Sequence, residues 1–209
     1  MMALVFVAAS FTSCKYFRGQ IVDGPGMERE VDSLSTDSIS ENIEQMPETA
    51  VRQPNAYFQY AVYINAESEE TASVWLADER AGTVRKICVT NPMAETQWER
   101  MNGKESDAVD VPLTQIAAAD KAMLAPGDVS KVIVEGCPDG RNVWTYIIDT
   151  NTKTAKQFPS TEGVLDTNWD KKEITLGFYG YDDEGRYSYK KVFSIDGKFL
   201  RFTGDKERE

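Results

Sequence analysis

The side chains best suited to acid–base chemistry in this sequence are carboxylates that gather at expected turns. They are found at Asp78-Glu79, Asp139 and Asp182-Asp183-Glu184. A glycoside hydrolase needs two carboxyl groups about 5–10 Å apart, one of which its surroundings keep protonated. Acidic residues are also common in β-turns, because their side chains accept backbone N–H groups. A carboxylate-based hydrolase is therefore an alternative function and not the leading one.

Histidine is absent from the chain. Its absence excludes Ser-His-Asp and Cys-His nucleophiles and His-containing zinc sites. Calcium could use oxygen ligands from acidic turns, but the spacing Asp-x-Asp-x-Asp-Gly does not occur. We predict no catalytic residues, no metal site and no cofactor.

Aromatic side chains form the remaining chemical signal. Trp144 and Tyr146 share one face of an expected strand, and Tyr179 and Tyr181 share a face of another. Exposed rings of this kind stack on sugar faces, so these four residues are the candidate ligand-stacking aromatics. The alternative is core packing, because strands favour Tyr and Trp as parts of a half-buried surface.

The first residues are uncharged and carry a short apolar run from Ala3 to Ala9. This run is too short to span a bilayer, which takes about 20 residues, but it suits the apolar centre of a secretion signal. The sequence Phe11-Thr12-Ser13-Cys14 resembles the lipobox of bacterial lipoproteins, although Phe11 replaces the usual Leu and no Lys or Arg precedes the run. The resemblance implies that residues 1–13 are a signal peptide and that Cys14 is acylated. The alternative is an apolar first element with Cys14 as a buried thiol.

The lipoprotein resemblance also implies a location and a partner, namely a membrane reached through the N-terminal lipid. No acidic residue lies between Lys15 and Arg18, whereas lipoproteins exported to the surface of some Gram-negative bacteria commonly carry acidic residues there. The periplasmic side is thus expected. In that oxidising compartment Cys88 and Cys137 form an even pair, for which we predict a disulfide. The alternative is two separate buried thiols.

The segment between the lipobox and the first expected strand is acidic. Residues 19–55 carry eight acidic and two basic side chains, a net charge of −6, and include Gly24-Pro25-Gly26. A segment with low hydrophobicity and net charge of one sign buries too little apolar surface to offset the conformational entropy that its chain would lose on folding. Residues 14–55 are therefore predicted to be a lipid anchor and flexible tether. The alternative is a segment that folds on a partner through Leu34, Ile39, Ile43 and Met46.

Residues 56–209 have the pattern of an antiparallel β domain. Phe58, Tyr60 and Val62 alternate with the residues between them, which is the period of a strand. Three similar units of strand, turn and strand follow, at 73–89, 132–158 and 174–202. Turns such as Asp139-Gly140 and Asp196-Gly197 supply residues that tolerate the left-handed backbone conformation.

The repeat length favours a propeller-like meander. Aligning Ile133 with Ile174 gives an offset of 41 residues, and aligning Asp149 with Asp196 gives 47. Residues 125–202 resemble TolB-type propeller repeats through Ala125-Pro126-Gly127-Asp128 and Trp169-Asp170-Lys171-Lys172. At about 40 residues per blade the domain holds three to four blades, whereas closed propellers usually have four to eight. An open β-meander or a β-sandwich is the alternative.

An insertion at 91–124 interrupts the repeats, and we expect one or two short helices there. Asn91-Pro92 is a typical helix start leading into Met93 to Met101, and Thr114 opens an Ala-rich stretch to Met123.

The overall charge restricts the partners. The net charge is −11 at pH 7, which repels nucleic-acid phosphates, so no nucleic-acid partner is expected. The sequence therefore predicts a non-catalytic envelope lipoprotein that binds a protein or a glycan of the cell wall through its β domain. The alternatives are the lipid-anchored hydrolase and a structural subunit of an envelope complex.

Overall fold

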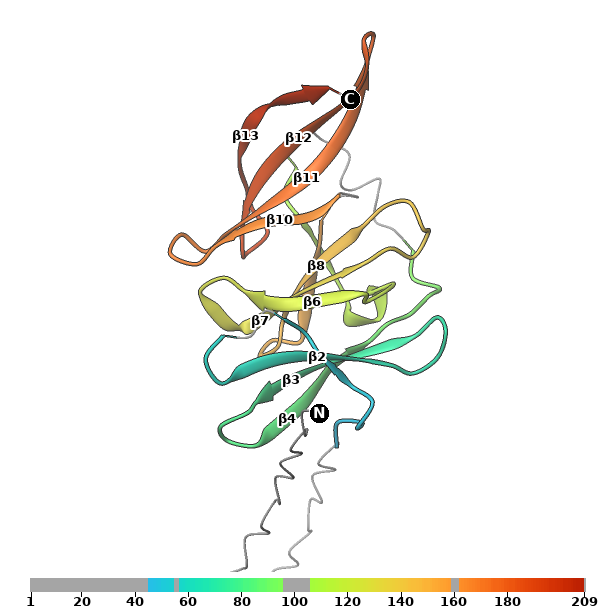
Figure 1. Ribbon diagram of the computed structural model, residues 1–209, viewed down its shortest axis with the longest axis vertical. Coiled ribbons are helices and arrows are strands. Elements are labelled where there is room, and N and C mark those ends of the chain that lie inside the picture. Colours follow the sequence, from blue (N-terminus) through green and yellow to red (C-terminus); the bar gives the residue numbers. More distant parts are fainter. Residues whose placement is uncertain (1–44, 55–56, 96–105, 159–161, 209) are drawn as a thin grey trace, which may run out of the picture. The chain divides into compact units, whose positions relative to one another are not determined.

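The computed structural model describes residues 45–54, 57–95, 106–158 and 162–208. These residues form three antiparallel sheets that follow one another along the chain (Figure 1). The first sheet has the order β1-β2-β3-β4, and the third has the order β10-β11-β12-β13. Both are plain meanders of consecutive strands. The second has the order β5-β9-β8-β7-β6.

The strands have the following bounds. The first sheet contains β1 (Val51–Arg52), β2 (Tyr60–Ala66), β3 (Ala72–Asp78) and β4 (Thr83–Val89). The second contains β5 (Val109–Val111), β6 (Lys121–Ala125), β7 (Asp128–Gly136), β8 (Trp144–Asp149) and β9 (Thr154–Gln157). The third contains β10 (Gly163–Asn168), β11 (Glu173–Asp182), β12 (Gly185–Ser194) and β13 (Phe199–Arg208).

The predicted class, an antiparallel β-meander in blade-like repeats, is confirmed. Each of the three predicted units supplies the later strands of one sheet. Among the described strands, no strand of one sheet pairs with a strand of another. No helix of the described residues is long and apolar enough to cross a membrane.

Two hydrophobic cores join the sheets. The first core contains Val62 and Leu76 of the first sheet with Val132 and Val134 of β7. The second contains Ile133, the residue between those two valines, with apolar residues of the third sheet such as Ile174, Leu176 and Phe193. Because successive side chains of a strand point to opposite faces, β7 buries both of its faces. Its uninterrupted apolar run is the signature of such a doubly covered strand.

The insertion at 91–124 differs from the prediction. A short helix is present there, but it is the three-residue 3-10 helix η2 (Leu113–Gln115). The Ala-rich stretch after it does not form a helix, because Lys121–Ala125 is strand β6, paired with β7. Of the helix expected from Met93 to Met101, the described residues 93–95 are turn and coil, and the rest lies outside the described residues.

The first sheet begins within the segment assigned to the tether. Val51 and Arg52 pair with Ile64 and Tyr63 of β2. The Thr49 hydroxyl donates a hydrogen bond to Oδ1 of Asn65 over 2.6 Å. The signal peptide, Cys14 and the remaining tether up to residue 44 lie outside the described residues.

Candidate functional site

The exposed side chains of Tyr57 and Phe58 and the partly buried Trp169 form a group of rings that we call the aromatic ledge. The ring of Tyr57 stacks on that of Trp169, with centroids 4.1 Å apart and planes 15° apart. The ring of Phe58 meets Tyr57 edge-on at 4.4 Å. The segment before β2 therefore presents two rings beside the turn between β10 and β11.

Within the aromatic ledge, Phe58 has both a highly exposed side chain and an unusual backbone conformation. Its side chain is 83% exposed, and its φ of +52° lies in the left-handed region. That region is unfavourable for residues with a Cβ and uncommon for bulky ones. Strained backbone of this kind persists only where the surroundings determine it, and it clusters at binding sites and active sites.

Trp169 anchors the ledge to the domain. It is partly buried and packs against the first core. Gly127, in the turn between β6 and β7, approaches it closely, since a Cβ there would lie 2.9 Å from the carbonyl oxygen of Trp169. The φ of Gly127 is also positive, at +73°. Glycine is therefore required at this position, both by the close approach and by the backbone conformation.

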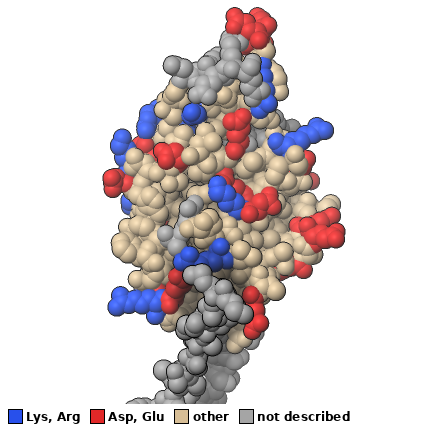
Figure 2. Space-filling model, in the orientation of Figure 1, with Lys and Arg blue, Asp and Glu red and all other residues tan. Residues whose placement is uncertain are grey.

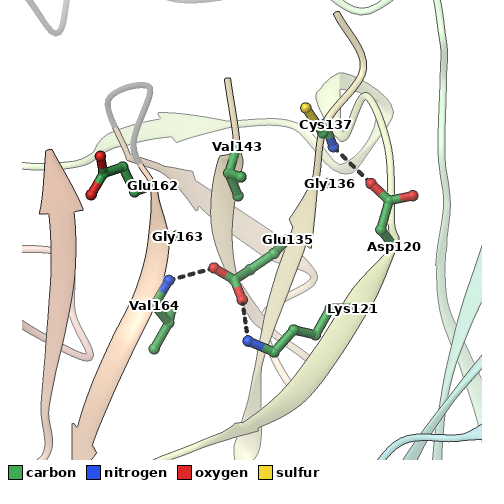
Figure 3. Close-up of a pocket in the computed structure, with 9 residues that line it drawn as sticks. All are labelled: Asp120, Lys121, Glu135, Gly136, Cys137, Val143, Glu162, Gly163 and Val164. Carbon is green, nitrogen blue, oxygen red and sulfur yellow. Dashed lines mark hydrogen bonds and ion pairs between the residues drawn. The ribbon is translucent and has the colours of Figure 1, made fainter. Parts of the chain in front are cut away.

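A second candidate is a cavity of about 210 Å³ where the second and third sheets approach each other (Figure 3). Its polar lining comes from the ends of β6, β7 and β10 and consists of Asp120, Lys121, Glu135, Cys137 and Glu162. We call it the acidic pocket. Three carboxylates and a thiol around one cavity are the kind of arrangement that a hydrolase requires, so their contacts decide what the pocket can do.

Glu135 is the best-buried carboxylate of the acidic pocket, with a side chain only 6% exposed. One oxygen accepts the backbone N–H of Val164 at 2.5 Å, and the other lies 3.0 Å from Nζ of Lys121 (Figure 3). Gly163 makes room for this contact, because a Cβ there would lie 2.7 Å from Oε1 of Glu135. Both oxygens are thus held by the protein: the ion pair joins β7 to β6, and the hydrogen bond joins β7 to β10.

The other acids of the acidic pocket are also engaged. Oδ2 of Asp120 accepts the backbone N–H of Cys137 at 2.8 Å. Glu162 lies 3.5 Å from the guanidinium of Arg186. In the described part of the chain, no three Asp, Glu or Cys side chains are grouped so that they could hold a metal ion.

Electrostatic shifts elsewhere act against general-acid chemistry. Hydrogen bonds from Arg52 and Tyr63 lower the pKa of Glu79 to about 2. The backbone N–H of Asn142 lowers the pKa of Asp139, and a hydrogen bond from Arg201 lowers that of Glu173. A general acid in a glycosidase needs the opposite, a carboxyl pKa raised towards neutrality. These carboxylates remain ionised.

Cys88 and Cys137 are free thiols in the structure, and the disulfide between them stays a prediction. Cys88 lies in β4 and is buried in the first core. Cys137 follows β7 and lines the acidic pocket, where it is partly exposed. This arrangement matches the alternative of two separate thiols.

The candidate aromatics have two different environments. Tyr146 is fully buried in the first core, where its hydroxyl accepts the backbone N–H of Ala117 at 3.3 Å. Trp144 is partly buried against the same core. These two residues pack the core, as the alternative reading expects, and do not present their faces to a ligand.

Tyr179 and Tyr181 lie on the third sheet and are more accessible. The hydroxyl of Tyr179 donates to Oδ1 of Asn142 at 2.6 Å, and the guanidinium of Arg186 lies 4.6 Å from its ring. Tyr181 is 71% exposed and meets Tyr179 edge-on at 6.2 Å. Tyr181 is thus the member of the predicted set whose ring is free to meet a ligand.

The charged side chains are mixed on the face shown in Figure 2. Lys and Arg alternate there with Asp and Glu and do not gather into a stripe.

Comparisons with known proteins found similar solved structures but no family. No protein-family model and no curated protein matches the chain. One similar solved structure is the β-propeller domain of the Trilobed protease from Pyrococcus furiosus, with a TM-score of 0.49 and 13% identity, covering 76% of this chain and 44% of that one. Another is acylaminoacyl peptidase from Pyrococcus horikoshii, with a TM-score of 0.43 and 12% identity, covering 74% of this chain and 25% of that one. The chain spans less than half the length of either structure.

Sequence reasoning did not find the aromatic ledge. It placed Phe58 in a regular strand and treated Trp169 only as part of a repeat signature. Alternation alone cannot reveal a residue with positive φ, and no local signal shows that positions 57 and 169 stack. The two lie more than 100 residues apart, and only the folded chain brings them together.

Proposed function

We propose that this chain is a bacterial envelope lipoprotein whose β domain binds a protein or a glycan component of the envelope without catalysing a reaction. The observation that carries the proposal is the aromatic ledge, in which Phe58 combines a strained backbone with an almost fully exposed ring. Both features cost folding free energy. A binding role accounts for their coexistence.

The chemistry of the ledge suits recognition. Flat aromatic faces stack on the C–H faces of sugars and on apolar side chains, and aromatic residues are over-represented where partners bind. The stacked support from Trp169 holds Tyr57 in a fixed orientation, so little conformational entropy is lost when a ligand arrives.

Non-catalytic binding is favoured over the hydrolase because the acidic pocket has no free carboxylate pair. Glu135 is neutralised by Lys121 and held by the N–H of Val164. Both oxygens of this carboxylate are therefore occupied by contacts within the protein.

The membrane location is part of the same proposal. It depends on acylation of Cys14, with residues 15–44 as a spacer, and on the absence of acidic residues directly after Cys14 for the periplasmic side. A lipid anchor would keep the β domain close to envelope partners.

The test compares the mature protein with the variants Phe58→Ala and Tyr181→Ala, which each remove one exposed ring. Binding is measured by co-sedimentation with purified peptidoglycan and by a glycan array, and protein partners by cross-linking from a photoreactive residue at position 58 in intact cells. We expect Phe58→Ala to reduce binding at least tenfold and Tyr181→Ala to leave it within twofold.

Two outcomes count against the proposal. Binding that survives Phe58→Ala unchanged would remove the ledge as the site. Release of reducing sugar by the wild type that disappears in Glu135→Gln would establish the hydrolase instead.

A further inference from the structure

A cavity of about 320 Å³ lies where β4 of the first sheet approaches the end of β8 in the second. We call it the basic cavity. Its volume is at the lower end of the range of cavities that hold small ligands. Its lining combines three apolar residues with three basic ones and a single acid, and it contains Arg85, Lys86, Ile87, Leu113, Ile148, Asp149, Thr150 and Lys153.

The guanidinium of Arg85 is held in place across the two sheets. Arg85 lies opposite Leu76 of β3, which is buried in the first core, so its side chain leaves β4 on the face towards the second sheet. Its Nη2 donates a hydrogen bond to Oγ1 of the buried Thr150. That hydroxyl in turn donates to the carbonyl oxygen of Ser130 at 2.7 Å. The contact occupies one of the five N–H groups of the guanidinium and orients the others.

The two lysines of the basic cavity differ in direction. Lys86 follows Arg85 on the same strand and therefore points to the opposite face. Its Nζ lies 5.1 Å from the centroid of the Trp75 ring. Lys153 is exposed in the turn between β8 and β9 and lines the basic cavity. Arg85 and Lys153 are thus the two cations that an occupant would meet.

The single acid of the lining is turned into its own turn. Oδ1 of Asp149 accepts the backbone N–H groups of Asn151 and Thr152 at 2.9 and 3.1 Å. The whole chain carries a net charge of −11, which acts against anions at long range. At physiological ionic strength charges beyond about 8 Å are largely screened, so the nearby cations decide the local attraction.

The remaining wall of the basic cavity is apolar. Ile148 is buried in the first core, and Ile87 and Leu113 pack against that core and are partly buried. An occupant would therefore meet an oriented guanidinium and an ammonium on one side and aliphatic side chains on the other. A few convergent polar groups in an otherwise apolar concavity are typical of small-molecule sites.

We propose that the basic cavity binds a small organic monoanion, namely a carboxylate carried on an apolar body. The carboxylate accepts hydrogen bonds from the free N–H groups of Arg85, whose planar fork matches its two oxygens, and Lys153 adds a second positive charge. The apolar body packs on Ile87, Leu113 and Ile148. Arg85, Lys153 and Asp149 together carry one net positive charge, which a monoanion neutralises and a dianion exceeds.

The basic cavity adds a small-molecule site to the proposed binding function and shares no residue with the aromatic ledge. Phe58→Ala should therefore leave its ligand binding unchanged. Failure at one site is distinguishable from failure at the other, because each has its own variant and its own ligand.

The experiment titrates the purified protein at pH 7 by isothermal calorimetry with 2-naphthoate, with the uncharged 2-naphthamide and with the more highly charged 2-naphthyl phosphate. We expect the wild type to bind naphthoate at least tenfold more tightly than naphthamide, and at least as tightly as the phosphate. Arg85→Met should abolish the preference for the acid over the amide. Arg80→Met is the matched control and should preserve it, because Arg80 lies in the turn before β4 and does not line the basic cavity.

A second variant removes the other cation. Lys153→Met should weaken naphthoate binding about threefold, as expected for an exposed charge. The φ of Lys153 is +56°, and methionine also carries a Cβ, so the variant changes the charge and keeps the backbone strain. Because Lys153 is exposed, this variant decides the test if Arg85→Met fails to fold, which the thermal midpoint reveals.

Four results would overturn the proposal. They are equal affinity of the wild type for naphthoate and naphthamide, absence of naphthoate binding at millimolar concentration, tighter binding of the phosphate than of the carboxylate, and a preference for the acid that persists in folded Arg85→Met. An equal loss of affinity in Arg80→Met would also count against the basic cavity, because it would indicate a general effect of charge.

Discussion

At the scale of single residues, Phe58 combines two features that oppose folding. Its ring is exposed, and its φ is one that glycine adopts without cost. The ring of Phe58 contacts the ring of Tyr57 edge-on, and this contact buries little of the Phe58 ring. The conformation therefore orients the ring outward instead of stabilising the domain.

Replacing Phe58 by Gly should make the protein more stable. Glycine relieves the left-handed strain, and an exposed ring loses little burial, so we expect the free energy of unfolding to rise by about 1 kcal/mol. Urea unfolding measures the change. Phe58→Ala keeps the strain and serves as the control, with little change in stability. A loss of stability in Phe58→Gly would show that the ring itself supports the fold.

The two thiols should differ in reactivity. Burial raises the pKa of Cys88 to about 12, and burial together with Asp139 and Asp120 raises that of the more exposed Cys137. Since the thiolate is the reactive form, we expect iodoacetamide at pH 8 to label Cys137 slowly and Cys88 only after unfolding. Peptide mass mapping distinguishes them. Resistance of both cysteines in denaturant until a reductant is added would demonstrate a disulfide instead.

At the scale of elements, the short strand β1 depends on side-chain contacts. It has two residues, and Arg52 reaches Glu79, just after β3, with Nε 2.7 Å from one oxygen and Nη2 3.0 Å from the other. The hydroxyl of Tyr63 donates to the same Glu79 at 2.8 Å. This bidentate pair connects β1 to the end of β3, across the intervening strand β2.

Acid should loosen this contact. The pKa of Glu79 is lowered from 4.5 to about 2 in the folded protein. A lowered carboxyl pKa contributes stability that is fully present above pH 4.5 and is lost as the pH falls towards 2. We expect the Glu79 carboxyl to titrate near pH 2 by carbon NMR, and at a higher pH in Arg52→Met, where the hydrogen bond from Tyr63 remains.

Arg201→Met provides the comparison for the acid titration, because Arg201 makes the equivalent pair with Glu173 in the third sheet. It should leave the titration of Glu79 unchanged. High salt should weaken both pairs, since they are exposed. A titration of Glu79 near pH 4.5 in the wild type would contradict the pairing.

In strand β6, tertiary packing outweighs the helical propensity of the local sequence. Alanine favours helix, and the stretch before Met123 is rich in it. In the structure Ala122, Leu124 and Ala125 are buried, and β6 pairs with β7 along its length. The small side chains let β6 lie between two cores, which outweighs the modest helical preference.

At the scale of the whole molecule, the middle sheet organises the β domain. Its residues contribute to both cores, so the first and third sheets are each attached to it. The signal at the N-terminus determines the expected location, and the β domain supplies the proposed binding surfaces.

The proposed acylation of Cys14 predicts that removing its thiol releases the protein from membranes. We expect the wild type to partition into the detergent phase of Triton X-114 and Cys14→Ser to partition into water, since several acyl chains anchor stably. Mass spectrometry of the mature N-terminus is the accompanying measurement. A wild-type chain that keeps residues 1–13 would refute the lipoprotein proposal.

The sequence by itself determined the antiparallel β class, the three repeating units and their turns. Strand alternation and Asp-Gly turns are local patterns, and each reports a local backbone state. The absence of histidine by itself also excluded histidine-based catalysis.

Only the tertiary structure decided which side chains meet. It placed Tyr146 in a core, joined Glu135 to Lys121 and to the N–H of Val164, and stacked Tyr57 on Trp169. It also placed Nζ of Lys191 4.3 Å from the centroid of the Phe178 ring. Such contacts depend on the approach of separate strands and turns, which periodicity along one strand does not encode. A binding surface arises from the packing of distant segments, so it becomes visible only when they are folded together.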